Sequence, residues 1–402
     1  MKKNLLKRMM SLTMVAAMAL SMAGCGGSAA TEEATTSDST ASAETSEGGT
    51  FKIGGIGPTT GAVAIAGASV KAGAEIAVEE INAAGGINGM MVEMNYQDDE
   101  HDAEKAINAY NTLKDWGMQV LMGTVTSNPC IGVAPEAEAD NMFLLTPCAS
   151  AVECIVADNA FRVCFSDPNQ GAASAQYIVD NGVADKVAVI YDSSDVYSSG
   201  IYESFAAGAA EYGVDIVETQ AFTSESRTDF SVQIQKAKAS GAELVYIPIY
   251  YSDATLILAE AVKQGYDARF FGCDGLDGIL NVEGFDTSLA EGLMLLTPFA
   301  ADATDDLTVS FVEKYMDKVG EVPNQYAADG YDAIYIIKAA AEAAGVTADM
   351  DYSTICDLMV PVMTEITVAG LTGPAMTWEA SGEPNKDPKV VEIVDGAYVL
   401  MQ

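Results

Sequence analysis

The stretch "FKIGGIG", residues 51–57, begins the pattern that decides the fold. It is typical of a short buried strand, and the apolar residues of the next segment, from about Gly67 to Ala83, recur at helical spacing. Three glycines in "GGINGM" then end the helix, and "MVEMNYQ" at residues 91–97 alternates apolar and polar residues as a strand does. A strand, a helix and a second strand in this order predict one unit of a parallel sheet covered by helices.

The same alternation runs through most of the chain. Asp102 is expected to cap a second helix, "QVLMG" and "MFLLTP" are the next strands, and a helix over residues 129–140 separates them. The pattern restarts at "KVAVIYD" and continues through "DIVETQAF", "ELVYIPIY" and "ARFFGCD", with helices over residues 199–212 and 254–265. A mainly helical segment follows "GLMLLTPF", and residues 366–402 return to strand-like character. The sequence therefore predicts an α/β protein with two Rossmann-like units and parallel central sheets.

Length and charge narrow the class of protein. The chain has 402 residues, which is too long for one ordinary core and indicates two domains. Acidic residues outnumber basic ones by 58 to 20, so nucleic acid and an anionic membrane surface would repel the protein. We therefore expect no nucleic-acid partner, and the acidic balance by itself indicates only solubility.

The first 24 residues have the features of a secretory signal. A basic start is followed by an apolar run from Met9 to Leu20, which is too short for an ordinary membrane span. The next residues, Ala23-Gly24-Cys25, resemble the bacterial lipoprotein box, in which the cysteine is lipidated and becomes the new N-terminus; Met22 stands where that pattern prefers leucine. The sequence thus predicts a lipid anchor at Cys25, and an ordinary cleaved signal is the alternative.

Residues 26–50 contain no apolar side chain larger than alanine, so they are expected to form a disordered tether. A flexible tether of this length spans roughly 25–30 Å root-mean-square. The predicted location is therefore extracytoplasmic, with the folded part held by its lipid at the outer face of the cell membrane.

Cysteine and histidine usage bears on redox and metal chemistry. Six cysteines follow the signal region, and an exported protein permits disulfides between them. Cys154 and Cys164 are the preferred pair, although a protein of this size needs no bridge for stability. No C-x-x-C motif occurs and His101 is the single histidine, so no zinc site is expected and no cofactor is indicated.

Catalytic interpretations find little support. The glycines of "GGIGPTTG" follow G-x-G-x-x-x-G rather than the dinucleotide-binding pattern, and no P-loop lysine occurs. Cys148 and Ser150 lack a base, because His101 lies in the acidic segment "YQDDEHDAEK" and is expected to be a solvated loop residue. Carboxylates are abundant at strand ends, yet no spacing marks an acid/base pair. The sequence therefore indicates a protein that is not an enzyme.

Ligands of open α/β sheets bind outside the carboxyl ends of the strands. Five predicted strand ends are rich in Ser, Thr, Tyr and Asp and contain no His, Lys or Arg: "GTVTSN", "TPCAS", "YDSSDVYSSG", "IYYSD" and "GCDGLDG". Helix-start N–H groups and hydroxyls on one domain suit a carboxylate, while an acidic residue on the other suits an ammonium. The pattern favours a small zwitterion bound between two domains that close over it.

The segments "FKIGGIGPTTGAVAIAG" and "EEINAAGGINGMMVE", followed by "DD", form a specific combination. Together with "FLLTPCAS", "FRVCFSDPNQG" and "GLTGPAMTWEASGEP", they resemble the branched-chain amino-acid type of periplasmic (type I) solute-binding protein, across residues 51–400. That family implies two α/β lobes joined by three crossover segments, with the ligand in the cleft. The resemblance implies a first lobe of residues 51–167 plus 299–377 and a second lobe of residues 168–298 plus 378–402.

In the first lobe, the resemblance implies a site for the ligand carboxylate. Ser127 matches the serine after the family's "G-x-x-[TS]" motif. Cys148, Ala149 and Ser150 match the backbone and hydroxyl site of "T-P-A-[AS]-[ST]", and capping of the next helix is the alternative role for Ser150. The family's disulfide positions near this site are occupied by His101 and Thr126, so that bridge is absent.

In the second lobe, the resemblance implies a site for the ligand ammonium and side chain. Asp274 matches the acidic residue that holds the ammonium, and a turn-forming aspartate is the alternative. Tyr197 and Tyr250 match aromatic residues that cover the ligand; "VYSSG" replaces the family's "YGxG", and Tyr251 is a shifted alternative to Tyr250. Ordinary lobe packing is the other interpretation of Tyr250, and Trp378 is expected to pack structurally at the hinge.

The implied function is that of an extracytoplasmic receptor of an ABC importer. Such a protein binds a small amino acid, branched-chain or similar, and delivers it to permease subunits and their ATPases. Two alternatives use the same fold: a ligand-sensing domain of a signalling system, or a receptor for a non-amino-acid solute such as an amide or an aromatic acid.

Overall fold

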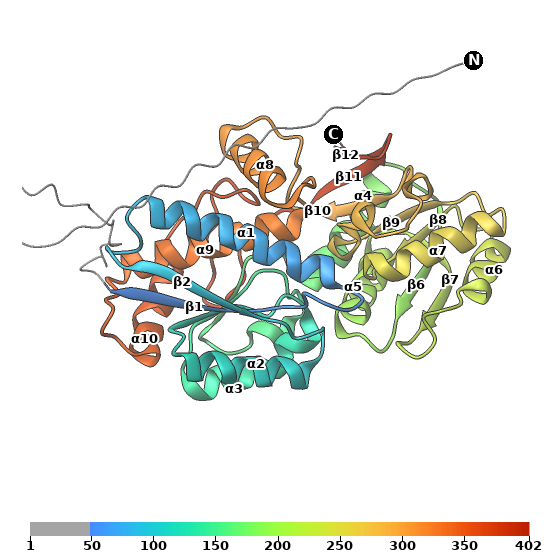
Figure 1. Cartoon of the computed structure of the whole chain (residues 1–402). Helices are drawn as coiled ribbons and strands as arrows, with labels where there is room; N and C mark the ends of the chain where they lie inside the picture. The colour runs from blue at the N-terminus through green and yellow to red at the C-terminus, as the bar shows by residue number, and fades with distance from the viewer. Residues whose placement is uncertain (1–48, 402) are drawn as a thin grey trace, which may run out of the picture. The chain divides into compact units, whose positions relative to one another are not determined.

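The first of two sheets contains five strands, and every neighbouring pair of strands runs parallel. The computed structural model describes residues 49–401 (Figure 1). The strands, in the spatial order β2-β1-β3-β4-β5, are β1 (Thr50–Ile56), β2 (Met91–Gln97), β3 (Val120–Gly123), β4 (Leu144–Thr146) and β5 (Ala160–Arg162). Thr50, which the sequence assigned to the tether, pairs with Met91 and is the first residue of β1. The predicted signal, Cys25 and the tether up to residue 48 lie outside the described residues.

Helices cover both faces of this sheet. α1 (Ala64–Ala83) packs against α9 (Gln325–Ala343), and α2 (Ala103–Trp116) packs against α3 (Ser127–Asp140) on the other face (Figure 1). The side chains of β3 alternate between the two layers: Val120 and Met122 belong to the core that includes α1, whereas Leu121 belongs to the core that includes α2 and α3. A strand buried on both faces is a continuous apolar run, as "QVLMG" is.

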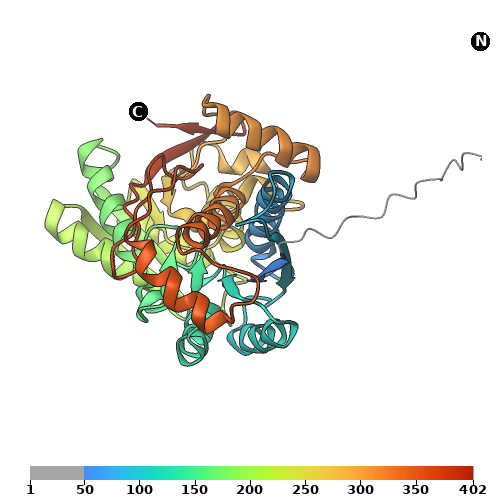
Figure 2. The same cartoon turned by 90° about the vertical axis from the view of Figure 1, so that its left-hand side faces the viewer.

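Two more helices from the C-terminal half join this layer. α8 (Asp306–Val319) packs on α1, and α10 (Tyr352–Met363) packs on α9 and β3. Figure 2 shows α8 beside α1, although the two helices are far apart in the sequence. We call the first sheet, with α1–α3 and α8–α10, the first lobe.

The second sheet contains seven strands in the order β12-β11-β10-β9-β8-β6-β7. The strands are β6 (Lys186–Asp192), β7 (Asp215–Phe222), β8 (Leu244–Ile247), β9 (Arg269–Gly272), β10 (Met294–Thr297), β11 (Lys389–Val394) and β12 (Ala397–Leu400). β6 to β10 are parallel, as predicted, but β11 and β12 form an antiparallel hairpin on the β10 edge. β11 and β12 pair antiparallel because they are joined by the two-residue turn Asp395-Gly396. Both turn residues have positive φ angles, 52° and 75°. A connection of two residues can join only antiparallel strands.

Four helices surround the second sheet. α4 (Asp167–Asp180) packs against α5 (Val196–Tyr212), and α6 (Ser231–Ser240) packs against α7 (Tyr251–Lys263). Short 3₁₀ helices complete the chain: η1 (Val152–Ile155) beside α3, and η2 (Asp274–Leu276), η3 (Ile279–Asn281) and η4 (Thr287–Ala290) after β9. We call this sheet, with α4–α7 and η2–η4, the second lobe.

α3, α5 and α7, like α1, begin earlier than the sequence predicted. α3, α5 and α7 start at Ser127, Val196 and Tyr251, directly after short turns, rather than at residues 129, 199 and 254. The polar residues at these strand ends were interpreted as loops, whereas they form the first helical turns. As a consequence, several predicted site residues lie at helix N-termini, where backbone N–H groups are free.

The chain passes between the lobes after β5, after β10 and before β11. Trp378 lies beside the first of these passages: its side chain is buried, and its Nε1 donates to the carbonyl oxygen of Arg162 at 2.8 Å. This contact agrees with the predicted structural role of Trp378. The boundaries predicted at residues 167, 298 and 377 stay a prediction.

All six cysteines within residues 49–401 are buried and carry free thiols, so the preferred bridge between Cys154 and Cys164 is not formed. Cys154 lies in the core beside α3, where its Sγ points to the carbonyl oxygen of Ser127 at 3.7 Å. Cys164 follows β5 and is buried separately. Cys154 and Cys164 are therefore close in the sequence but are not bonded to each other in the fold.

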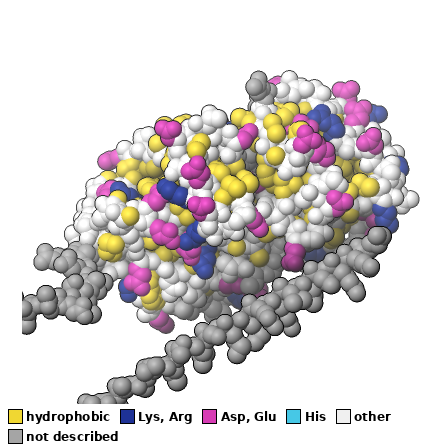
Figure 3. Space-filling view, turned by 45° about the horizontal axis from the view of Figure 1, so that its top comes forward, with side chains coloured by type: hydrophobic (Ala, Val, Ile, Leu, Met, Phe, Trp, Pro, Cys, Tyr) yellow, Lys and Arg dark blue, Asp and Glu magenta, His cyan; other side chains and the backbone are white. Residues whose placement is uncertain are grey.

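Acidic side chains are spread over the surface shown in Figure 3, and basic side chains are scattered singly among them. Within residues 49–401, no helix is long and apolar enough to cross a bilayer. The same residues contain no group of three His, Cys, Asp or Glu side chains arranged to hold a metal ion.

Candidate functional site

Three predicted site residues of the second lobe contact one another. Tyr197 lies in the first turn of α5 after β6, Tyr250 directly precedes α7 after β8, and Asp274 begins η2 after β9. Because β6, β8 and β9 are neighbouring parallel strands, their carboxyl ends meet at one edge of the sheet. The hydroxyl of Tyr197 donates to Oδ1 of Asp274 at 2.6 Å, and its ring stacks on that of Tyr250 with centroids 4.8 Å apart. The structure brings all three together.

Gly275 makes this arrangement possible. Its N–H donates to the hydroxyl oxygen of Tyr197 at 2.7 Å. A Cβ atom on residue 275 would lie 2.4 Å from that oxygen, so a larger residue would push the tyrosine away. The hydroxyl of Tyr197 therefore accepts from Gly275 and donates to Asp274, which fixes the carboxylate in one orientation.

Asp274 is 3% exposed, and burial raises the pKa of its carboxyl group to about 6. The hydrogen bonds from Tyr197 and the Gly275 N–H offset part of this rise. A carboxylate held in a dry site with few donors favours a cationic partner, because an opposite charge relieves the cost of burial. Asp274 is therefore suited to an ammonium group.

The predicted site residues of the first lobe form a second group. Ser127 is the first residue of α3, and its Oγ accepts from the N–H of Ala151 at 3.2 Å. The N–H of Ala149 donates to Oγ1 of Thr146 at 2.9 Å, which fixes the turn after β4. Ser150 is fully buried, and its Oγ has no hydrogen-bond partner among residues 49–401. The free hydroxyl and the helix N-terminus are suited to a ligand carboxylate.

The guanidinium of Arg162 binds the backbone of this turn. It donates to the carbonyl oxygens of Ala149 and Ser150, and to that of Ala151 at 2.9 Å. Arg162 also pairs with Glu383 at 3.4 Å and is completely buried. Its charge is thus engaged by the protein, and the backbone of residues 149–151 is rigidly placed.

Cys148 lies at the bottom of the same turn. Its Sγ is 3.8 Å from Oδ2 of Asp329, and burial, with the Asp329 charge, raises the pKa of the thiol well above its usual range. A thiol that stays protonated is a poor nucleophile. The side chain therefore serves as a small, neutral part of the site wall.

The two lobes meet directly over Asp274. Its carbonyl oxygen accepts from Nε2 of Gln325 at 3.2 Å and from the hydroxyl of Tyr326 at 3.1 Å, both in the first turn of α9 in the first lobe. Nearby, the N–H of Gln325 donates to Oδ2 of Asp277 at 2.7 Å. These contacts describe lobes closed on each other. Gln325 and Tyr326 were not predicted from the sequence, because they belong to a helix start far along the chain.

His101 is not the solvated loop residue that the sequence predicted. Its ring is 5.5 Å from that of Tyr250, edge to face, and its Nδ1 is 2.8 Å from Oγ1 of Thr126. Burial, with the nearby Arg227 charge, lowers the pKa of the imidazole to about 4, so the ring is neutral near pH 7. His101 therefore belongs to the contact between the lobes at the tyrosines.

Two residues of α4 also reach the site and were not predicted. The Oε1 of Gln170 accepts from the N–H of Asp274 at 3.1 Å, and Asp167 donates its own N–H to the carbonyl oxygen of Ser150 at 3.0 Å. Both lie in "FRVCFSDPNQG", a segment that contributed only to the family resemblance. The available signal in the sequence was the pair of polar residues, Asp167 and Gln170, one helical turn apart.

These residues divide into an acidic side and a side with free donors. Asp274 and two tyrosines stand on the second lobe, while Ser127, Ser150 and a helix N-terminus stand on the first. This arrangement can bind a small molecule that carries an ammonium and a carboxylate, and it offers no activated nucleophile or acid/base pair.

The sequence pattern of the family described as "Periplasmic binding protein" matches residues 50–397. The chain belongs to this periplasmic binding protein family. Among curated relatives, it is 32% identical over 300 residues to the Leu/Ile/Val-binding protein homolog 3 of Brucella melitensis biotype 1, covering 74% of this chain and 80% of that one. Members of the family bind solutes rather than transform them.

Solved structures agree with the fold of this periplasmic binding protein. The leucine-binding protein LivK of Thermotoga maritima superposes with a TM-score of 0.78 at 28% identity, covering 88% of this chain and 98% of the other. The branched-chain amino-acid transporter substrate-binding protein LivJ of Streptococcus pneumoniae, solved in complex with isoleucine, gives 0.78 at 25% identity, covering 88% and 100%. The predicted two-lobed α/β fold and the predicted family are thus confirmed.

Proposed function

We propose that this protein is the extracytoplasmic receptor of an ABC importer and that it binds a branched-chain amino acid between its two lobes. In this proposal, Asp274 holds the ligand ammonium, and Ser127 with residues 148–150 holds the ligand carboxylate. Tyr197 and Tyr250 cover the ligand from the second lobe. Permease subunits and their ATPases are the partners to which the closed receptor delivers it.

One observation carries the proposal: the second lobe contributes a buried carboxylate, and the first lobe contributes a buried hydroxyl that has no partner among the described residues. Asp274 is 3% exposed, and Ser150 is fully buried with an unpartnered hydroxyl. An α-amino acid supplies both complementary charges at a fixed separation. It would therefore bridge the lobes and stabilise their closure.

Charge also limits which amino acids fit. The cations around the cleft are already paired: Arg162 with carbonyl oxygens and Glu383, Lys386 with Asp329, and Arg227 with Asp192. A second carboxylate on the ligand would find no counter-ion and would lie near Asp274. Acidic amino acids are therefore disfavoured, and the names of the relatives favour an aliphatic side chain.

The test is a calorimetric and thermal-shift panel with leucine, isoleucine, valine, glutamate, 4-hydroxybenzoate and glutamine. We expect the three aliphatic amino acids to bind, and a ligand at 100 times its Kd to stabilise the protein by about 2.7 kcal/mol. Binding of the aromatic acid but of no amino acid would overturn the proposed ligand class. Absence of binding by every compound would remove the support for an amino-acid receptor.

The lipid anchor belongs to the same proposal. It rests on the Ala23-Gly24-Cys25 pattern after an apolar run, residues that lie outside those the structure describes. The family itself implies an extracytoplasmic location. A lipid on Cys25 and a tether would keep the receptor close to its permease, which raises the effective concentration of the encounter.

A further inference from the structure

Cys130 and Cys154 are buried in the same core. Cys130 lies in the first turn of α3, and Cys154 lies in η1, which packs against α3. Both side chains are completely buried. Of the six cysteines in residues 49–401, these two belong to the core that includes α2 and α3. The fold therefore brings together two thiols that are well separated in the sequence.

The start of α3 places the two thiols in contact. The Sγ of Cys154 lies 3.7 Å from the carbonyl oxygen of Ser127. Ser127 and Cys130 are one helical turn apart on the same face of α3, so a sulfur atom at this carbonyl lies beside the Cys130 side chain. The two thiols interact directly with each other. Cys164, the partner predicted from the sequence, does not belong to this core.

Cys130 is the more reactive thiol of the pair. The interaction with Cys154 lowers the pKa of the Cys130 thiol in spite of its burial, and a backbone hydrogen bond from Thr124 and the charge of Arg162 act in the same direction. Burial, with the neighbouring Cys130, raises the pKa of the Cys154 thiol well above its usual range. A position in the first turn of a helix also favours a thiolate. Cys130 is therefore suited to start a thiol–disulfide exchange.

η1 gives the two thiols a route to solvent. It is a 3₁₀ helix of four residues, Val152–Ile155, and it lies at the surface: Val152 is 47% exposed, and Val156, which follows it, is 78% exposed. A single short turn opens locally at a much lower free energy than the whole fold. Opening of η1 lifts Cys154 out of the core and uncovers the sulfur of Cys130 beside it.

We propose that Cys130 and Cys154 form a disulfide in the exported protein, by exchange with a low-molecular-weight disulfide outside the cytoplasm, where disulfides persist. The Cys130 thiolate attacks one sulfur of that disulfide, breaks its S–S bond and releases one thiolate, which takes up a proton. The Cys154 thiol then loses its proton, attacks the Cys130 sulfur of the mixed disulfide and releases the second small thiol. Two protein thiols are oxidised, and one small disulfide is reduced to two thiols.

The bridge closes a loop of about 25 residues, which restricts the unfolded chain and stabilises the folded one. It also joins the two segments that form the first-lobe group of site residues. α3 begins at Ser127, and η1 directly follows Ala151, whose N–H donates to the Oγ of Ser127. The structure describes the reduced pair. The inference concerns the protein itself and does not depend on the identity of its ligand.

The experiment is differential alkylation of the wild-type protein before and after incubation with oxidised glutathione. Free thiols are blocked with N-ethylmaleimide in denaturant, bridged thiols are then reduced and labelled with iodoacetamide, and mass spectrometry locates each label. Cleavage after glutamate and arginine places Cys130, Cys154 and Cys164 on three different peptides. A digest made without reduction identifies the linked pair directly.

We expect only Cys130 and Cys154, among the six cysteines of residues 49–401, to carry the second label after oxidation. Thermal unfolding of the oxidised protein should occur about 3–6 °C higher than that of protein reduced with dithiothreitol. Cys130→Ala and Cys154→Ala should each abolish this difference. Cys164→Ala and Cys356→Ala, which remove buried thiols outside this core, should retain it.

Blocking of both Cys130 and Cys154 by N-ethylmaleimide after the incubation would overturn the inference. A linked pair of Cys154 and Cys164 would also overturn it, as would glutathione that stays on Cys130 and is not displaced by Cys154. The wild-type labels decide the question even where a variant fails to fold. None of these outcomes involves ligand binding, so a failure here leaves the proposed function standing.

Discussion

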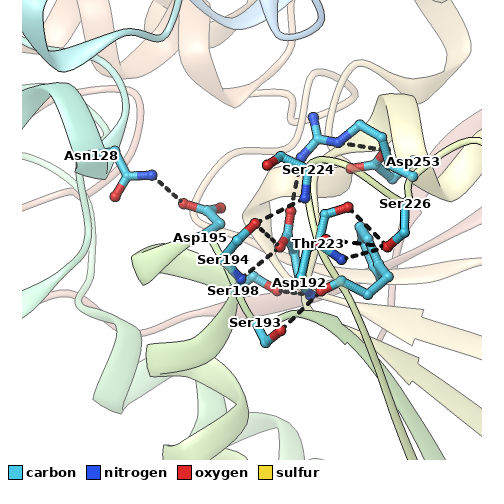
Figure 4. Close-up of polar contacts among 12 residues, drawn as sticks. Asn128, Asp192, Ser193, Ser194, Asp195, Ser198, Thr223, Ser224, Ser226 and Asp253 are labelled. Carbon is cyan, nitrogen blue, oxygen red and sulfur yellow. Dashed lines mark hydrogen bonds and ion pairs between the residues drawn. The ribbon is translucent and has the colours of Figure 1, made fainter.

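The Nδ2 of Asn128 donates a hydrogen bond of 3.1 Å to Oδ1 of Asp195, and this bond joins the two lobes (Figure 4). Asn128 lies in the first turn of α3 in the first lobe, one residue after Ser127. Asp195 is the N-cap residue of α5 in the second lobe, two residues before Tyr197. The bond therefore connects residues that lie one and two positions from two proposed ligand residues, and it can exist only when the lobes are closed.

Asn128→Ala removes this bond and should shift the ligand-free receptor toward an open form. A hydrogen bond of this kind contributes about 0.5–1.5 kcal/mol, so ligand affinity should fall by roughly 2- to 10-fold. Small-angle scattering without ligand should show a larger radius of gyration, and calorimetry should report the affinity. Asn111→Ala is the control, because that amide bonds only within α2. Identical scattering and affinity for the two variants would show that the bond has no role in closure.

Asp274→Asn should weaken amino-acid binding strongly. The substitution keeps the size of the side chain but removes the charge that pairs with the ligand ammonium, and losing one partner of a buried charge pair costs about 2–5 kcal/mol. Asp286→Asn is a suitable control, because Asp286 is an exposed cap of η4 in the same lobe. Calorimetry with leucine measures both. An unchanged Kd for Asp274→Asn would remove Asp274 from the ammonium site.

Cys25→Ser should release the receptor from the cell membrane. A thiol is required for lipid attachment, so the serine variant should leave the membrane fraction and appear in soluble extracytoplasmic fractions. Fractionation followed by immunoblotting measures the distribution, and Cys356→Ser, a change in the folded part, is the control. Retention of Cys25→Ser in the membrane fraction would contradict the lipid anchor and favour another mode of attachment.

The strands were predictable because their apolar runs are bounded clearly. β6 (Lys186–Asp192) and β7 (Asp215–Phe222) occupy the residues expected of "KVAVIYD" and "DIVETQAF". The hairpin of β11 and β12 was missed even though Asp395-Gly396 is a recognised two-residue turn. Its strands are short and half exposed, so the periodic signal was weak, and the turn was the main local indication of a hairpin.

Only those site residues that come directly after a strand could be predicted from the sequence. Tyr197, Tyr250 and Asp274 meet because the strands before them are neighbours. In a parallel sheet the carboxyl ends of the strands lie at one edge, so this meeting could be predicted. Tyr326 and His101 were not predictable, since they reach the site through packing of α9 and of a loop on the opposite lobe. Hydrogen bonding across lobes depends on tertiary structure, which no local pattern encodes.

The pH dependence of binding and of stability should have opposite signs. Burial raises the pKa of Asp274 to about 6 and that of Asp195 to about 7, from an ordinary value of 3.8. Between about pH 4 and pH 7, the folded ligand-free protein therefore holds protons that the unfolded chain has released. Its free energy of unfolding should consequently fall as the pH rises through this window.

A bound ammonium reverses the preference at Asp274, because it favours the ionised carboxylate. Binding should therefore release protons, and leucine affinity should rise with pH from about 5 to about 7 and level off above it. Calorimetry at several pH values, together with thermal unfolding of the ligand-free protein, measures the two trends on one sample. In Asp274→Asn the pH dependence of the residual affinity should be much reduced, while in Asp286→Asn it should match the wild type. Leucine affinity that stays constant between pH 5 and pH 7 would contradict an ammonium held by a carboxylate with a raised pKa.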